Sequence, residues 1–350
     1  MNDRHSQQSP NRREGKHLAE VVHFGDQQVF AGATTYTCLL FLDKEAQPSF
    51  NFVKAHDLAA WRQGEARVEG KVEASQATAT EWNFTVGSDS GLFATLQAMP
   101  VKLGDVAHIF QGLVTGADGV FVMKTDDAFH SELLRPFLQP DRLAPYQTPN
   151  PKHKMLFPYR VIKGRAELLA SDLLRKTYLD AWTYLLEHAK QLRQRERGKW
   201  DHERWYAFGR SQNLVQMDAP KLIIQVTATK PTVVYDDQSL YMTGGGSGPF
   251  YGIRPTLPGL DMKYLMGILN SKIFGFYVKR QSTPLRGGYF KFSKQYIVNA
   301  PIRTIDFTSP VDVARHDRMV GLVERMLELH KKLAAEQTPH VKTVLQRQIE

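Results

Sequence analysis

The chain has 350 residues, of which 42% are hydrophobic and 23% charged, and its net charge is +9. These values are ordinary for a globular protein, and the length suggests two domains. No apolar run reaches the roughly 18 residues that span a bilayer, and the polar residues 1–17 lack the apolar core of a signal peptide, so we expect a cytoplasmic protein with a disordered N-terminus and no membrane partner.

Positive charge is concentrated in two blocks of the sequence. Residues 152–210 carry 14 Lys and Arg against 7 Asp and Glu, and residues 262–305 carry 8 Lys and Arg with no acidic residue. A charge run is often only a solvated face of a protein. A long block that has no carboxylate but contains glycines and aromatic residues favours contact with nucleic-acid phosphates.

The N-terminal part predicts strands. Residues 21–30 predict a strand with a turn at Gly25. Residues 33–42 are β-branched and then apolar, which predicts a buried strand. Cys38 lies in that run and is the single cysteine of the chain. We therefore expect a buried, unreactive thiol with no internal disulfide.

Short helices are expected next. Residues 50–63 predict a strand that leads into a short helix, and residues 88–99 predict a second helix capped by Ser88 or Asp89. Pro100 closes this second helix. We therefore expect a domain boundary within residues 86–102.

A glycine-rich loop and a long helix follow. Gly112, Gly116 and Gly119 separate two apolar strand-like runs, which suggests turns or close approach of the backbone to a ligand. The loop lacks the GK[ST] ending of a nucleotide-binding P-loop. Residues 171–197 carry apolar residues at spacings of three and four, which predicts one amphipathic helix.

The stretch RWYAFGRSQNL, residues 204–214, joins two aromatic residues to a polar cluster of Arg, Ser, Gln and Asn. Such side chains are rarely buried together, because each would need a hydrogen-bonding partner. They are also the residue types that read base edges: Arg for guanine, Gln and Asn for adenine, Ser for either. A capped polar loop and a base-reading loop both remain open interpretations.

The C-terminal third alternates strands, glycine loops and helices. Residues 221–228 and 231–237 predict short strands, and residues 260–280 predict a helix. The intervening loop contains Gly244, Gly245, Gly246 and Gly248, whose freedom of backbone conformation suits close approach to an anion or, alternatively, a flexible hairpin. Residues 311–333 predict a last amphipathic helix that packs on the body of the protein or on a partner.

Signatures of several chemistries are missing. The sequence has no zinc-ligand spacing and no GxSxG nucleophile elbow. Asp57, Glu69 and Lys71 weakly resemble the carboxylate–lysine pattern of metal-dependent nucleases. We therefore predict no metal site and no catalytic residue, with residual nuclease activity as an enzymatic alternative.

The order of motifs resembles the TaqI-like C-terminal specificity domain, the target-recognition part of adenine-N6 DNA methyltransferases that include fused type IIG restriction-modification enzymes. The resemblance spans residues 100–310. Its motifs are QGLVTGADGVFVM, LRPFLQPDRLAPY, FPYR, YLLEHAKQLRQRE, WYAFGRSQNL, YMTGGGSGPFYGI, LMGILNSKIFGFY and RGGYFKFSKQYIVNAPI. Upstream, residues 21–42 resemble the last strands of the preceding methyltransferase domain.

This resemblance implies an α+β fold with a defined order of parts. After the disordered residues 1–17, residues 18–99 would be the C-terminal remnant of a Rossmann-like methyltransferase domain. Residues 100–310 would form a mixed α/β target-recognition domain. Residues 311–350 would form a C-terminal amphipathic helix.

The glycine-rich S-adenosylmethionine motif and the Asn-Pro-Pro-Tyr-type catalytic motif of such methyltransferases do not occur in this sequence. We therefore expect no cofactor in this chain, S-adenosylmethionine in the complete enzyme, and no methyl transfer by this chain alone. The chain would be a truncated or split gene product, or a specificity or scaffold subunit that acts with a separate catalytic chain. An inert gene remnant is the remaining alternative.

The implied partner is double-stranded DNA in a restriction-modification or phage-defence system. Basic side chains would neutralise phosphates, a few side chains would read bases, and the target adenine would flip into the catalytic domain. The residues expected to contact DNA, with the two glycines approaching it through their backbone, are Thr115, Arg160, Arg210, Ser211, Gln212, Gly245, Gly246, Arg286, Tyr289 and Lys291.

Overall fold

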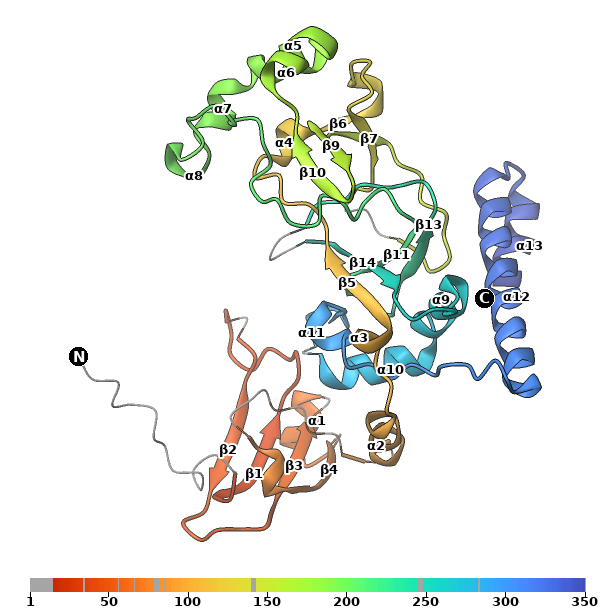
Figure 1. The fold of residues 1–350 in the computed structure, drawn as a ribbon. Helices are drawn as coiled ribbons and strands as arrows, with labels where there is room; N and C mark the ends of the chain where they lie inside the picture. The colour runs from red at the N-terminus through yellow and green to blue at the C-terminus, as the bar shows by residue number, and fades with distance from the viewer. Residues whose placement is uncertain are drawn as a thin grey trace. The chain divides into compact units, whose positions relative to one another are not determined.

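The computed structural model describes the chain except for residues 1–14, 34, 56, 66, 79–81, 83, 85, 88, 140–142, 245–247, 283 and 350. The predicted mixed α+β fold is confirmed (Figure 1). The chain forms two compact units. Unit 1 comprises Met1–Pro100 and Gly275–Lys291, and unit 2 comprises Val101–Phe274 and Phe292–Glu350. The return of Gly275–Lys291 to unit 1 was not anticipated from the sequence.

Unit 1 is built on a four-stranded sheet in the order β2-β1-β3-β4 (Figure 1). β1 runs antiparallel to β2 and parallel to β3, and β3 runs antiparallel to β4. The elements of this part of the chain are β1 (Leu18–His23), β2 (Cys38–Leu42), β3 (Ser49–Ala55), α1 (Leu58–Arg62), β4 (Arg67–Glu73), the 3-10 turn η2 (Ala74–Gln76) and α2 (Ser90–Ala98).

The alternation of side chains along β3 builds two small cores. Phe50 and Phe52 lie in one hydrophobic cluster, and Val53 and Ala55 lie in another. Phe50 and Phe52 stand two residues apart, as Val53 and Ala55 do, so each pair shares one face of the strand. β3 is therefore buried from both sides.

β2 differs from its prediction. Every residue of this strand is exposed, including Cys38, and Leu42 has 71% of its surface open to solvent. The expected buried strand and buried thiol are therefore wrong. An apolar sequence favours burial, but β2 is the edge strand of its sheet and pairs only with β1, and nothing in the described part of unit 1 covers it.

The described part of unit 2 contains three small antiparallel sheets. Their strand orders are β13-β11-β14-β5, β6-β8-β7 and β10-β9. The strands are β5 (Ala107–Gln111), β6 (Val122–Lys124), β7 (Leu134–Phe137), β8 (His153–Leu156), β9 (Tyr159–Ile162), β10 (Arg165–Leu168), β11 (Lys221–Gln225), β13 (Val233–Asp236) and β14 (Phe250–Pro255). Two two-residue strands are β12 (Thr227–Ala228) and, in unit 1, β15 (Phe290–Lys291). Short turns of helix are α3 (Leu103–Val106), α4 (Asp118–Phe121), η3 (Thr125–Asp127) and α11 (Lys294–Ile297).

The long helix predicted at residues 171–197 is broken into four pieces. They are α5 (Ser171–Thr177), α6 (Leu179–Glu187), α7 (Ala189–Arg193) and α8 (Arg195–Gly198). Tyr178 leaves the helical region with φ −125° and ψ 53°, and Glu196 and Arg197 have positive φ. Because of these breaks, apolar side chains from successive helices pack in one hydrophobic core. They include Leu174, Trp182 and Leu192.

The helix predicted at residues 260–280 is also broken, into α9 (Met262–Leu269) and α10 (Lys272–Gln281). The break falls at Asn270. Its side-chain amide donates to the Val233 carbonyl and accepts from the Val233 backbone N–H, both at 2.9 Å. Asn270 thus ties the end of α9 to β13 by a pair of bonds that mimics a strand partner.

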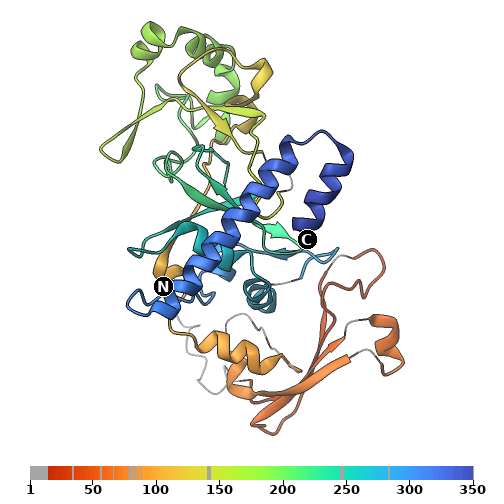
Figure 2. The same cartoon turned by 90° about the vertical axis from the view of Figure 1, so that its right-hand side faces the viewer.

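The amphipathic helix predicted at residues 311–333 is present, and a second helix follows it. α12 (Pro310–Ala335) packs on α9, where a Cβ at Gly267 would lie 2.7 Å from Met319 Sδ. The chain then turns, and α13 (Pro339–Ile349) runs back along α12 (Figure 2). The turn follows from Pro339, because proline starts a helix well and cannot continue one. No helix in the described ranges is long and apolar enough to cross a membrane.

Candidate nucleic-acid interface

The stretch at residues 204–214 divides into a buried half and an exposed half. Trp205 and Tyr206 are buried, and the Tyr206 hydroxyl donates to the Leu169 carbonyl at 2.7 Å. Arg210, Ser211 and Gln212 are exposed. The aromatic residues therefore anchor the loop, and the polar residues that follow are presented to solvent.

The backbone of this loop is joined to the glycine-rich loop at residues 111–119. Gly209 N donates to the Thr115 carbonyl at 2.8 Å, and Arg210 N donates to the Val114 carbonyl at 3.0 Å. A Cβ at Gly209 would lie 3.3 Å from Gly116, so glycine permits this approach. Gly116 itself has φ +72°, a conformation that side chains disfavour.

A third segment, residues 241–244, lies on the other side of the glycine-rich loop. Leu113 N donates to the Met242 carbonyl at 2.8 Å, and Gly244 N donates to the Leu113 carbonyl at 2.7 Å. A Cβ at Gly112 would clash with the carbonyl group of Thr243. The three segments together form what we call the three-loop surface, residues 112–116, 209–213 and 241–244.

Arg195 fastens two of these loops from inside the protein. Its guanidinium donates to the carbonyls of Thr115 at 2.8 Å, Trp205 at 2.6 Å and Ala207 at 2.9 Å, and Nε donates to Leu192 at 2.9 Å. Arg195 is buried. Arg195 therefore has a structural role, because its guanidinium holds the two loops together through their carbonyl groups. The sequence did not predict this role.

Thr115 does not fit its predicted contact with DNA. The residue is fully buried, and its hydroxyl donates to the Asp118 carboxylate and accepts from Ala117 N. The side chain closes a local turn at the start of α4. What Thr115 contributes to the three-loop surface is its carbonyl, which holds Gly209 and Arg195.

The exposed cations of unit 2 that we predicted to contact DNA each have a carboxylate neighbour. Arg210 Nη1 lies 2.9 Å from Glu196 Oε1, and Arg160 Nη2 lies 3.1 Å from Glu167 Oε2. The hydrogen bond from Arg210 is the largest of several influences that lower the pKa of Glu196 below its usual value. Both arginines remain more than half exposed, at 55% and 56% of their side-chain surface.

A cavity of about 860 Å³ adjoins the three-loop surface. Its lining runs from β10 and the loop after it to Arg210 and Ser211, and it includes the aromatic rings of Tyr159, Trp200 and Tyr206. Burial raises the pKa of Tyr159 to about 12, and its hydroxyl accepts from Phe208 N at 2.6 Å. The Tyr159 side chain is therefore neutral and serves to hold the aromatic half of the loop.

Three further predicted residues belong to the other unit of the chain. Arg286, Tyr289 and Lys291 belong to unit 1, where Arg286 Nη2 donates to Gln28 Oε1 at 2.7 Å and Leu285 N donates to the Tyr289 carbonyl at 2.7 Å. Arg286 and Lys291 are exposed. Gly245 and Gly246 lie outside the described residues. The second basic block is thus divided between the two units.

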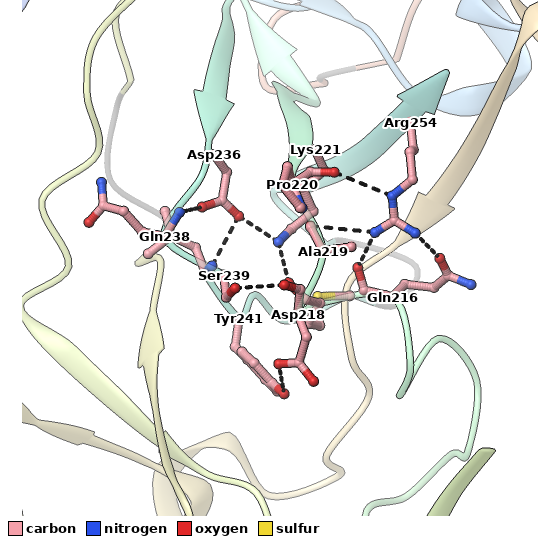
Figure 3. Close-up of polar contacts among 12 residues, drawn as sticks. Gln216, Asp218, Ala219, Pro220, Lys221, Asp236, Gln238, Ser239, Tyr241 and Arg254 are labelled. Atoms are coloured by element: carbon pink, nitrogen blue, oxygen red, sulfur yellow. Dashed lines mark hydrogen bonds and ion pairs between the residues drawn. The ribbon is translucent and has the colours of Figure 1, made fainter. Parts of the chain in front are cut away.

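A buried polar network supports the 241–244 segment (Figure 3). Lys221 and Asp236 are wholly inaccessible, with Nζ 2.5 Å from Oδ2, and Nζ also donates to the Met217 carbonyl at 2.6 Å. Asp236 accepts from the backbone N–H groups of Gln238 and Leu240 at 2.9 and 3.0 Å. Burial lowers the pKa of Lys221, and Asp236 opposes that change.

The same network reaches Tyr241. Its hydroxyl donates to Asp218 Oδ1 at 2.7 Å, and the Ser239 hydroxyl donates to the Asp218 carbonyl at 2.6 Å (Figure 3). Lys221 and Asp236 were not selected from the sequence. Their antiparallel pairing could have indicated the ion pair, because Lys221 begins one predicted strand and Asp236 ends the next, so the two residues stand opposite each other.

The residues of the nuclease hypothesis serve other purposes. The Asp57 carboxylate caps α1 by accepting from Ala60 N at 2.7 Å, and Glu69 pairs with Arg67 at 3.4 Å. Among the described residues there is no group of at least three His, Cys, Asp or Glu that could hold a metal ion.

Comparisons with known proteins find similarity to restriction-modification proteins. Residues 160–302 match the model of the TaqI-like C-terminal specificity domain. The chain is 24% identical to the type II restriction enzyme and methyltransferase RM.Eco57I of Escherichia coli, over 96% of this chain and 37% of that protein. It is 28% identical to the type II methyltransferase M.XhoI of Xanthomonas vasicola, over 53% of this chain and 32% of that protein. The chain therefore spans well under half the length of these relatives.

A solved structure shares the fold. The chain is similar to the type IIL restriction-modification enzyme MmeI, solved in complex with DNA, with a TM-score of 0.53 at 10% identity. The similarity covers 91% of this chain and 39% of that chain, and at this identity it concerns the fold alone. The match of residues 160–302 confirms the predicted resemblance to the TaqI-like C-terminal specificity domain, and the two relatives are a type II restriction enzyme and methyltransferase and a type II methyltransferase.

Proposed function

We propose that the chain recognises a specific sequence in duplex DNA and directs adenine-N6 methylation in a restriction-modification system. The observation that carries this proposal is the three-loop surface, whose hydrogen-bonded backbone presents Arg210, Ser211 and Gln212 to solvent. These three residues lie within residues 160–302, which match the specificity-domain model. Base reading needs such preorganised side chains, because ordering a mobile loop on binding would cost affinity.

The chemistry of the exposed residues suits direct readout in the major groove. Arginine pairs with the O6 and N7 acceptors of guanine, glutamine pairs with adenine, and a good bidentate pair contributes about 1–3 kcal/mol of discrimination. Arg160, Arg286 and Lys291 are exposed cations that suit phosphate contacts. Tyr289 lies between Arg286 and Lys291 in the sequence. Phosphate contacts fix orientation and carry no sequence information.

Methyl transfer would need residues that this chain lacks. The sequence holds neither the S-adenosylmethionine motif nor the Asn-Pro-Pro-Tyr-type motif. In the complete enzyme, a separate domain or subunit would bind S-adenosylmethionine and receive the extruded adenine. We infer that residues 18–99 are the C-terminal remnant of such a methyltransferase domain, and that the working protein is cytoplasmic.

A specificity subunit that docks a separate catalytic chain is a second candidate function, favoured by β2. The edge strand exposes Leu39, Leu40, Phe41 and Leu42 together. An exposed apolar edge strand is a template for pairing with another chain. α13, which has no buried residue in the described chain, is a weaker candidate for the docking element. Nothing in the geometry of Asp57, Glu69 and Lys71 favours the nuclease alternative.

The test is selection of bound sites from a random-sequence duplex DNA library by the full chain, followed by the Arg210→Ala variant. We expect a defined consensus for the natural protein. Arg210→Ala should weaken binding to the consensus about tenfold or more while changing binding to random DNA little, because the substitution removes one bidentate pair with a base. Equal weakening on both DNAs would make Arg210 a phosphate contact. Failure to enrich any consensus would refute sequence recognition by this chain.

A further inference from the structure

Glu196 stands beside the exposed arginine of the three-loop surface. Arg210 Nη1 donates both to Glu196 Oε1 at 2.9 Å and to the Gly209 carbonyl at 2.7 Å. An exposed ion pair is usually worth little, because two long side chains must be ordered to form it. The geometry around Glu196 indicates that this pair instead fixes the orientation of the Arg210 side chain.

The backbone holds Glu196 in an unusual conformation. Glu196 has φ 50° and ψ 41°, Arg197 has φ 63° and ψ 39°, and Gly198 has φ +85°. The left-handed region is unfavourable for residues with a Cβ and persists only where neighbouring contacts impose it. Arg195, immediately before, supplies those contacts through its bonds to the carbonyls of both loops.

Trp200 interacts with both Arg195 and Glu196. The Arg195 guanidinium lies 4.3 Å from the centre of the Trp200 ring, and interaction with the Trp200 side chain contributes to lowering the pKa of Glu196. A chain of contacts thus runs from the buried Arg195 through Trp200 and Glu196 to the exposed Arg210. Glu196 is therefore placed before any ligand arrives.

Two consequences follow for Arg210. Its Nη1 is occupied, and Nε and Nη2 make no hydrogen bond to any residue that the structure describes, so these two nitrogens can form a fork toward one base. The adjacent carboxylate also neutralises the guanidinium and repels phosphates. A neutralised cation releases little counterion when it meets the DNA backbone, which favours a base edge over a phosphate.

We propose that Glu196 is a positioning residue that orients Arg210 toward a guanine edge and keeps it from the phosphate backbone. This inference rests on the proposed DNA recognition. Glu196 acts only through Arg210, so its removal should change which base is preferred at a single position of the recognised site.

The experiment repeats the duplex-library selection with full-length Glu196→Ala and Glu196→Gln. We expect Glu196→Ala to lose about tenfold of the guanine preference, at the same position that Arg210→Ala affects and at no other. The plot of log affinity against log salt should steepen by about one phosphate contact, because Arg210 is released to the backbone. Glu196→Gln should retain part of the preference, since its amide oxygen still accepts from Nη1.

Two further variants separate positioning from folding. Trp200→Phe keeps a ring for Arg195 to stack on but removes the indole N–H, so it should give a partial loss at the same base position. Asp201→Asn is the matched control, because Asp201 forms an exposed pair with Arg193 at 2.7 Å in the same segment. Asp201→Asn should leave the consensus unchanged.

The outcomes are distinguishable. If Arg210→Ala loses the guanine preference and Glu196→Ala keeps it, the positioning role is wrong and the proposed function stands. If Glu196→Ala weakens every position of the site equally and lowers the melting temperature, Glu196 is merely structural and the inference fails. If Arg210→Ala changes no base preference, both base reading by Arg210 and the positioning role of Glu196 are wrong.

Discussion

Lys221 and Asp236 illustrate how single residues set the geometry of the three-loop surface. An isolated buried charge is costly, and a buried ion pair stabilises only when its remaining donors and acceptors are satisfied. Lys221 has a carbonyl in addition to Asp236, and Asp236 has two backbone donors in addition to Lys221. By contrast, the exposed Arg160–Glu167 pair is worth about 0–1 kcal/mol.

Replacing Lys221 by methionine should destabilise the protein strongly. The change leaves the Asp236 carboxylate buried without its cation, which costs about 3–5 kcal/mol of unfolding free energy. Urea denaturation followed by circular dichroism measures the change. The double variant Lys221→Met with Asp236→Asn should recover part of it, because asparagine is neutral and its amide oxygen still accepts from one of the two backbone N–H groups, those of Gln238 and Leu240.

The control for this prediction is Lys230→Met. Lys230 is exposed in the same unit, and we expect its replacement to change the unfolding free energy by about 0.5 kcal/mol or less. A Lys221→Met variant as stable as the Lys230→Met variant would mean that the buried pair does not hold the 236–241 turn.

At the residue scale, side-chain chemistry predicted exposure at residues 210–212, and contact of these residues with DNA stays a prediction. Arg210, Ser211 and Gln212 are polar, and the structure exposes them as the sequence suggested. Thr115 was misjudged because threonine is small enough to be buried once its hydroxyl has a local acceptor. Lys221 was overlooked because a charged residue is normally exposed, and only its partner across the sheet makes burial tolerable.

Glycines control the contacts among the three loops. Gly112→Ala would place a methyl group against the Thr243 carbonyl, and backbone atoms cannot move aside cheaply. We expect a loss of about 1–3 kcal/mol of unfolding free energy from this overpacking. The variant should also show weaker consensus binding in a filter or fluorescence assay.

Gly119→Ala is the matched control in the same loop. A Cβ at Gly119 meets nothing within 4 Å, and the residue lies in α4, where alanine is a better helix former than glycine. This variant should bind the consensus normally and be as stable as the natural protein or slightly more so. Equal effects of the two substitutions would contradict a specific role for the Gly112–Thr243 contact.

β2 leads to a prediction about solubility. Leu40 and Phe41 are 50% and 49% exposed, so replacing both by lysine removes no core contact and should change the unfolding free energy by about 0.5 kcal/mol or less. Light scattering should reveal less self-association, since lysine on an edge strand opposes pairing between chains. A catalytic partner that docks on β2 should fail to co-purify with the double variant.

Val53→Lys on β3 provides the contrast, because Val53 is 3% exposed and belongs to a core cluster. It should unfold unit 1. If Leu40→Lys with Phe41→Lys is as damaging as Val53→Lys, then β2 is covered in the free protein and cannot be an open docking edge.

Helices and strands were predicted with different success. Short strands such as β11 and β13 lie where apolar and β-branched runs indicated them. Of the three long helices predicted from periodic apolar residues, the one at residues 311–333 is continuous, and those at residues 171–197 and 260–280 are interrupted. Periodicity reports which residues face a core, but it does not report that Asn270 bonds to a neighbouring strand or that Glu196 adopts a left-handed conformation.

For the whole molecule, the basic residues predict how binding depends on salt. Arg286→Ala with Lys291→Ala should lower the slope of log affinity against log salt by about 0.9 for each phosphate that the variant no longer neutralises, and should weaken binding to consensus and random DNA alike. Titrations at several salt concentrations measure this slope. A changed consensus, with the slope unchanged, would instead assign these residues to base reading.

Residue types and the order of motifs were enough to predict the specificity domain that the match at residues 160–302 confirms. Composition and charge indicated a globular protein with a nucleic-acid partner, the order of motifs indicated the specificity domain, and the polar residues at 210–212 marked a candidate reading loop. Composition, charge and motif order do not depend on which residues come into contact when the chain folds.

Which side chains are free to act depended instead on the tertiary structure. It buried Thr115, exposed β2, assigned Arg286 and Lys291 to a different unit from Arg210, and brought Glu196 to the side of Arg210. Most of these results depend on contacts between segments that are separated along the chain. Whether a side chain is buried or paired depends on every residue that surrounds it in the folded protein. A local sequence pattern does not show which residues those are.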